Sequence, residues 1–250
     1  MLLRALKSPN HSSLIDCSLH LQTTISNSVK FLELLHETTT PDGTSLKLAR
    51  QGSEIIILAD GKPLMSSRMH GSEEALALLA CHRAKSQERP CVLVGGIGMG
   101  FTLRAALDCL PPDAVVVVSE LVPAVVEWNR GILGPLARHP LSDKRVVVEV
   151  GDVGVTLRSS TDRFDAVILD VDNGPAAFTA SENSWLYSDQ SVAAIGRALR
   201  DAGVLAVWSA WDDRKFEQRL RYGGFSVEVE HVRARLKKGG PRHTLFLAYK

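Results

Sequence analysis

The distribution of apolar and polar residues becomes regular at Cys91. From there on, short unbroken apolar runs alternate with segments in which apolar positions recur every three to four residues. An unbroken apolar run is typical of a strand buried on both faces, whereas the longer period is typical of a helix. The pattern predicts strands at 91–96, 114–120, 145–152, 164–172, 204–210, 225–232 and 243–250, and helices at 101–110, 123–133, 153–160, 188–203 and 214–224.

This alternation predicts an α/β fold of the Rossmann-like type, with a seven-stranded, mostly parallel sheet and helices on both faces. Only residues 233–242 separate the last two predicted strands. That is too short for the helical crossover that a parallel pair needs, so we expect an antiparallel last strand. Pro123 is placed near the start of one helix, and Gly203 is placed as the C-terminal stop of another.

The residues before this region have a weaker pattern. Residues 1–40 are rich in Ser, Thr and His, with a short helix-like patch at 29–37. Residues 45–64 predict a small β-hairpin region, two short strands followed by a turn at Asp60-Gly61.

Residues 72–85 have helical periodicity, with Ser72 as the expected N-cap. We therefore divide the chain into an N-terminal arm with a small β region, residues 1–71, and a Rossmann-like domain, residues 72–250.

The composition is that of an ordinary globular protein, with 45% hydrophobic residues, 23% charged residues and a net charge of +1. No basic run predicts a nucleic-acid partner. No segment approaches the ~18 apolar residues of a membrane span, and the N-terminus lacks the apolar region of a signal peptide. The four cysteines, Cys17, Cys81, Cys91 and Cys109, have no zinc-ligand spacing. We expect a cytoplasmic protein without a metal.

A glycine-rich loop follows the first strand of the predicted sheet and opens a helix. Its glycines are Gly96, Gly98 and Gly100. Glycines let backbone N–H groups approach a ligand, and a helix N-terminus favours electron-rich groups. The dinucleotide pattern G-x-G-x-x-G fails because Phe101 occupies its third glycine position. The observed spacing is common in S-adenosylmethionine sites, although tight strand–helix packing also produces such glycines.

Acidic residues stand at the ends of the next three strands. Glu120 can accept hydrogen bonds from both ribose hydroxyls of an adenosine, unless it is a surface acid. Asp152 can accept from the adenine amino group or cap the following helix. Asp170 and Asp172 close the fourth strand and are candidate site acids. The alternative is a structural role, in which neighbouring backbone amides donate hydrogen bonds to Asp170 and Asp172 caps the following turn. Since ligands bind beyond the carboxyl ends of the strands, we expect these acids and the glycine loop to meet at one edge.

Several segments together resemble the spermidine synthase family, polyamine aminopropyltransferases on the class I S-adenosylmethionine-dependent methyltransferase fold. The likeness covers roughly residues 55–210. It rests on the segments LADGKPLMSS, VLVGGIGMGFTLRAAL, VVSE, VEVGD, FDAVILDVDNGP and WLYSDQSVAAIGRALRDAGVLAV.

The resemblance implies a transferase whose co-substrate is decarboxylated S-adenosylmethionine or S-adenosylmethionine itself. Asp170 would be the acid that starts the catalytic loop, and Asp172 a second acid nearby. In aminopropyl transfer a primary amine attacks a carbon beside a sulfonium, so a carboxylate that accepts the amine proton assists the attack. The acceptor would be a small-molecule amine or another nucleophile. Family members commonly form homodimers.

The sequence departs from the family at the amine-binding half of the site. Met99 stands where the family has an Asp in its glycine loop, and Glu74 is the candidate match for the Glu of its Tyr-His-Glu motif. Trp208 and Trp211 follow the fifth strand, either as a wall of the site or as core residues. Three interpretations stay open: an aminopropyltransferase, a small-molecule methyltransferase that uses S-adenosylmethionine, and a non-catalytic nucleoside-binding homologue.

Overall fold

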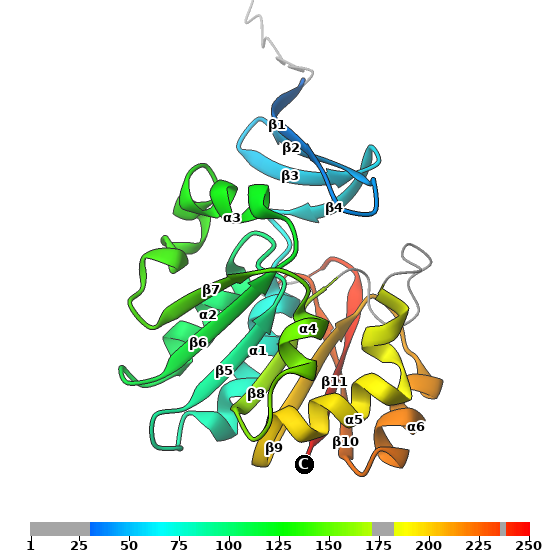
Figure 1. The fold of residues 1–250 in the computed structure, drawn as a ribbon. Helices are drawn as coiled ribbons and strands as arrows, with labels where there is room; N and C mark the ends of the chain where they lie inside the picture. Colours follow the sequence, from blue (N-terminus) through cyan, green and yellow to red (C-terminus); the bar gives the residue numbers. More distant parts are fainter. Residues whose placement is uncertain (1–30, 172–182, 236–238) are drawn as a thin grey trace, which may run out of the picture. The chain divides into compact units, whose positions relative to one another are not determined.

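The N-terminal part of the described chain is a four-stranded antiparallel sheet with strand order β1-β2-β3-β4 (Figure 1). The computed structural model describes residues 31–171, 183–235 and 239–250. The strands are β1 (Leu32–Thr39), β2 (Ser45–Gln51), β3 (Glu54–Ala59) and β4 (Lys62–Ser66). The expected hairpin of β2 and β3 is confirmed. The two-residue turn between β3 and β4 has positive φ at both Asp60 and Gly61, the requirement of a type I′ turn.

The helix-like patch expected at 29–37 is wrong, because residues 32–39 form strand β1. Its residues pair along the whole of β2, from Leu32 opposite Gln51 to Thr39 opposite Ser45. These hydrogen bonds join segments that are separate in the sequence. A local apolar pattern does not reveal them, and two of its leucines, Leu32 and Leu34, are exposed.

The larger sheet has seven strands in the order β10-β11-β9-β8-β5-β6-β7. Strands β5 to β9 pair in parallel, and β11 runs antiparallel to both β9 and β10. The predicted Rossmann-like sheet with an antiparallel last strand is therefore confirmed. Its strands are β5 (Cys91–Gly95), β6 (Val115–Glu120), β7 (Val146–Val150), β8 (Phe164–Leu169), β9 (Leu199–Ser209), β10 (Ser226–Arg233) and β11 (Arg242–Tyr249).

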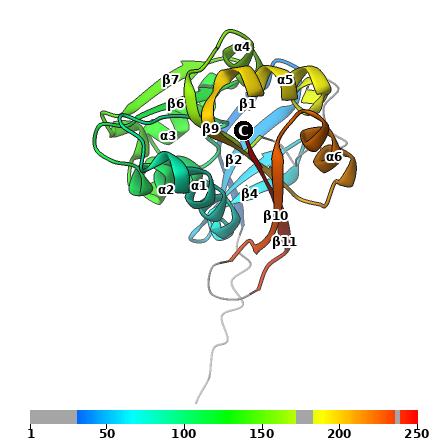
Figure 2. The same ribbon diagram turned by 90° about the horizontal axis from the view of Figure 1, so that it is seen from below.

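Helices cover both faces of this sheet, as Figure 2 shows from below. Helices α1 (Gly71–Ala84), α2 (Phe101–Cys109) and α3 (Pro123–Arg130) pack on one face, and α4 (Val153–Arg158), α5 (Asp189–Ala198) and α6 (Arg214–Tyr222) on the other. Successive strand residues alternate between the two cores: Val92 and Val94 face the first, and Leu93 faces the second. Short 3₁₀ helices occupy Gly134–Ala137, Pro140–Ser142 and Asn183–Tyr187. Within the described residues, no helix has the length and apolar character to cross a bilayer.

Two expected helix ends are corrected by the structure. Helix α1 begins at Gly71 with His70 as its N-cap, and Ser72 lies buried in the first turn. Helix α5 ends at Ala198 because β9 starts at the next residue, whose partner is Phe164 of β8. Gly203 lies inside β9 instead, where a Cβ would come 2.8 Å from the carbonyl oxygen of Arg200.

The strand order places a topological switch point between β5 and β8. From β5 the sheet continues through β6 and β7 on one side, and through β8, β9 and β11 on the other. In open α/β sheets, ligands bind beyond the carboxyl ends of the strands at such a point.

Candidate functional site

The glycine loop after β5 is built from residues with left-handed backbone. Gly96, Gly98 and Gly100 have φ of 81°, 49° and 84°. A Cβ on Gly96 would lie 2.7 Å from the Asp170 carbonyl oxygen, and one on Gly98 would lie 2.9 Å from the Met65 sulfur. Close packing by the chain itself therefore requires these glycines, which is the alternative that the sequence left open.

The same loop presents backbone donors at the sheet edge. Within the described part of the chain, the amides of Gly98 and Met99 have no hydrogen-bond acceptor. The loop is held from behind by Asn129, a fully buried side chain of α3. Its amide nitrogen donates to the carbonyl oxygens of Gly98 at 2.8 Å and Val125 at 2.9 Å. Sequence reasoning missed this support, because no local pattern distinguishes Asn129 from the other residues of its helix.

Glu120 ends β6 and is buried, so the alternative of a surface acid is wrong. One carboxylate oxygen accepts from the Ile97 amide and the other from the Val122 amide, each at 2.9 Å. The side chain thus ties the glycine loop to the end of β6. A carboxylate accepts up to about four hydrogen bonds, so ribose hydroxyls are compatible with both amide contacts.

Asp152 follows β7 and caps α4, as the second of its two expected roles proposed. Its Oδ1 accepts from the Gly154 amide at 2.8 Å, and its Oδ2 lies 3.4 Å from the Arg158 guanidinium. The ring of Trp185 stacks on Arg158 at 4.3 Å and covers Gly154. The side chain stays partly exposed, so binding of an adenine amino group remains a prediction.

Asp170 follows β8 directly and lies against the glycine loop. Its amide continues the ladder to Gly95, and its Oδ2 accepts from the Thr102 hydroxyl at 2.5 Å. Thr102 lies in the first turn of α2, next to the loop. The partner of the Asp170 side chain is therefore a hydroxyl group, and not the neighbouring backbone amides that the sequence left as an alternative. Asp172, the second expected acid, lies outside the described residues.

Glu73 is an acid of this site that the sequence interpretation missed. It lies in the first turn of α1 and faces Asp170. Burial, followed by the negative charge of Asp170, raises the pKa of Glu73 to about 7. Burial raises the pKa of Asp170 to about 6, against the lowering effect of the Thr102 hydrogen bond. The negative charge of one carboxyl disfavours ionisation of the other, so near neutral pH part of the pair stays protonated.

A chain of hydrogen bonds leads from Glu73 to strand β11. The Ser72 hydroxyl lies 2.6 Å from the Glu73 carboxylate and 2.9 Å from Nδ1 of His243 on β11. Burial lowers the pKa of His243, which favours the neutral imidazole. The ring of Trp208 contacts His243 edge-on at 4.5 Å, and its buried indole N–H has no partner among the described residues. Trp208 also packs against the core, whereas Trp211 is exposed.

Glu74, the candidate match for the family's Glu, pairs with a histidine. Its carboxylate lies 2.7 Å from Nδ1 of His70. The His70 ring stacks on Phe101, the residue that follows the glycine loop, at 4.0 Å. Glu73 is therefore the α1 acid that faces Asp170.

The predicted site residues that the structure describes share one edge of the sheet. Gly96 touches Asp170, Ile97 donates to Glu120, and the Glu120 carbonyl accepts from Gly151, next to Asp152. The glycine loop, Glu120 and Asp152 form the β5–β7 half of the site, and the acid pair with its hydrogen-bonded chain forms the β8–β11 half. No group of three or more His, Cys, Asp or Glu among the described residues is arranged to hold a metal.

No known protein family matches the sequence, and no curated protein matches it at a significant level. Solved structures do match. A spermidine synthase from Thermotoga maritima is 18% identical, with a TM-score of 0.67 over 87% of this chain and 73% of that one. A spermidine synthase in complex with the transition state analogue AdoDATO is also 18% identical, with a TM-score of 0.66 over 87% and 72%. A probable spermidine synthase from Corynebacterium glutamicum is 16% identical, with a TM-score of 0.58 over 86% and 79%. The chain therefore has a spermidine synthase-like fold, as the resemblance predicted.

Proposed function

We propose that the protein is a transferase that moves an aminopropyl group from decarboxylated S-adenosylmethionine to a small-molecule amine. The observation that carries the proposal is the carboxyl pair of Glu73 and Asp170 beside the glycine loop at the switch point. The likeness to spermidine synthases in fold supports the choice of reaction.

The nucleoside would lie along the β5–β7 half of the site. The Gly98 and Met99 amides would donate to it, and Glu120 would accept from the ribose hydroxyls. Glu120 is held in place at both oxygens, so it meets the ligand without losing rotamer freedom. Asp152, similarly fixed as an N-cap, would accept from the adenine amino group.

The amine would bind at the acid pair. An ammonium ion placed between the carboxyls would relieve their repulsion, which makes the pair complementary to a cation. For attack, the ammonium must lose a proton to a carboxylate, and Asp170 with Glu73 supplies the acceptor. The amine nitrogen then bonds to the propyl carbon, the carbon–sulfur bond breaks, and methylthioadenosine leaves with the electron pair on sulfur. Ser72 and His243 offer a path by which the proton moves on.

A second function, methyl transfer from S-adenosylmethionine, is favoured by one observation. Met99 is buried in the glycine loop, where the resemblance expects an Asp that holds the amine of the decarboxylated donor. An apolar side chain at that place supplies no acceptor for that amine.

Calorimetry and product analysis separate these functions. The protein is titrated with S-adenosylmethionine, its decarboxylated form and methylthioadenosine, and turnover is then assayed with putrescine as the acceptor. We expect binding of the decarboxylated form and release of methylthioadenosine with an aminopropylated product. Methyl transfer without aminopropyl transfer would establish the second function. Nucleoside binding without turnover over a panel of amines would identify a non-catalytic homologue and contradict the proposal.

A further inference from the structure

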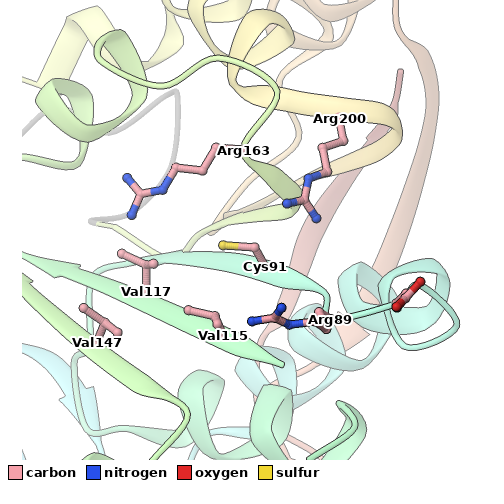
Figure 3. Close-up of a pocket in the computed structure, with 8 residues that line it drawn as sticks. Arg89, Cys91, Val115, Val117, Val147, Arg163 and Arg200 are labelled. Carbon is pink, nitrogen blue, oxygen red and sulfur yellow. The ribbon is translucent and has the colours of Figure 1, made fainter. Parts of the chain in front are cut away.

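A cavity lies at the amino ends of the strands (Figure 3), at the edge of the sheet opposite the one that Asp170 follows. Its volume is about 470 Å³. Cys91 and Val115 are the first residues of β5 and β6, and Arg163 immediately precedes β8. A five-residue strand spans about 16 Å, so this cavity is separate from the proposed catalytic site. The lining consists of Glu88, Arg89, Cys91, Val115, Val117, Val147, Arg163 and Arg200.

The floor of the cavity is apolar and continuous. Cys91 pairs with Val115, and Val117 pairs with Val147 in the next strand, so all four side chains lie on the same face of the sheet. Val147 is 47% exposed.

The floor is uncovered because α4 is short. This helix has six residues, a length of about 9 Å. It starts beside the carboxyl end of β7 and therefore covers only that half of the face.

The rim of the cavity is rich in arginine. It carries three guanidinium groups and one acid, Glu88, and two of the guanidinium groups are paired with acids outside the lining. Figure 3 shows Arg163 and Arg200 on the side of the cavity across from the valines. Arg200 donates to the buried Asp165 at 2.7 Å, and Arg163 donates to Glu149 at 3.1 Å. Among the described residues, Arg89 has no hydrogen-bond or ion-pair partner. Each guanidinium has five N–H donors, so most donors at this rim remain available.

We propose that this cavity binds a small organic anion, with its carboxylate or phosphate group between the arginines and a short apolar body on the valine floor. The arginine fork matches the geometry of both acid groups. A cavity of a few hundred Å³ with an apolar wall and a few polar groups is typical of small-molecule sites. Asp165 strengthens the assignment, because it fixes Arg200 and also accepts from the Cys91 amide at 2.7 Å. The cation is thereby positioned before a ligand arrives. This proposal is independent of the transferase activity.

Calorimetry of the full chain at low ionic strength tests the proposal, with hexanoate and hexyl phosphate as probes and with acetate and inorganic phosphate as their chainless counterparts. We expect at least one probe to bind at least tenfold more tightly than its counterpart, and the better probe identifies the acid group. Peptide mass spectrometry of maleimide labelling gives the location, since the bound probe should protect Cys91. Hexylamine, which has the same chain and the opposite charge, should leave Cys91 unprotected.

Two variants at exposed positions complete the test. Arg89→Gln should weaken probe binding at least fivefold, and Val147→Asp, which places a carboxylate on the floor, at least tenfold. Arg130→Gln, at an exposed arginine of α3, which packs on the other face of the sheet, is the matched control and should bind as the parent does. Unchanged affinity in Val147→Asp, or a probe that binds without protecting Cys91, would overturn the proposal. A third result would also overturn it: the parent binds neither probe but forms a dimer, and Val147→Asp dissociates that dimer. The face would then be an interface between two copies.

Discussion

The raised pKa of Glu73 predicts how folding stability depends on pH. Burial and the neighbouring charge hold the pKa of Glu73 at about 7, above its ordinary value of 4.5. A carboxyl with a raised pKa binds more protons in the folded state than in the unfolded state, so the free energy of unfolding falls as pH rises. For Glu73 the loss begins near pH 4.5 and is complete above pH 7.

The size of this loss follows from the interval between the two pKa values. At 1.36 kcal/mol for each pH unit, the interval from 4.5 to about 7 corresponds to about 3 kcal/mol. Glu73→Gln removes the charge and keeps an oxygen that accepts from Ser72. We expect the variant to be about 2–3 kcal/mol more stable than the parent at pH 8. At pH 4.5, where Glu73 is largely protonated, the two proteins should have similar stability.

Urea unfolding between pH 4.5 and pH 8.5 measures the difference. The comparison of parent and variant cancels the contributions of titrating groups that Glu73 does not influence, and equal m-values confirm that the same surface is exposed on unfolding. Glu127→Gln is the control, because Glu127 is an exposed acid of α3 that pairs with Arg130. If Glu73→Gln and the parent lose stability in parallel across this range, the pKa of Glu73 is not raised in the folded protein and the description of the site is wrong.

Three further variants test other parts of the site. Asp170→Asn should keep nucleoside affinity within about tenfold and reduce turnover by roughly 10²-fold or more, the range for loss of a positioned base; parent-like turnover would refute its role. Glu120→Ala should weaken nucleoside binding by about 1–3 kcal/mol in calorimetry and also lower thermal stability, since the Ile97 and Val122 amides lose their acceptor; unaltered binding would exclude the ribose contact. Gly96→Ala should lower the free energy of unfolding by about 1–3 kcal/mol, because its Cβ would lie 2.7 Å from a carbonyl oxygen at positive φ; an unchanged urea midpoint would show that the loop adapts.

The sequence was sufficient to predict the layout of the larger sheet. Strands that are buried on both faces appear as unbroken apolar runs, and the ten residues 233–242 leave no space for a crossover helix. Both signals are local, and so is the position of Glu120, Asp152 and Asp170 at the ends of strands. The convergence of these acids with the glycine loop follows from topology, since parallel strands present their carboxyl ends at one edge.

Other features depended on contacts between separate elements of the fold. Strand β1 forms through its pairing with β2, which overrides the helix-like pattern at 29–37. Glu73 becomes part of the site only because the first turn of α1 packs beside the end of β8, and its sequence neighbour Glu74 looks equally suitable. The supporting residue Asn129 is found only from its contacts with the glycine loop.

There is a physical reason why some features could be predicted from the sequence and others only from the tertiary structure. The sequence by itself determined the periodicity of each segment and the chemistry at the strand ends, because both depend on residues close together along the chain. The tertiary structure alone decided which carboxyls approach each other, which polar groups lose their water, and where a short helix leaves the sheet uncovered. These outcomes depend on the spatial packing of complete elements.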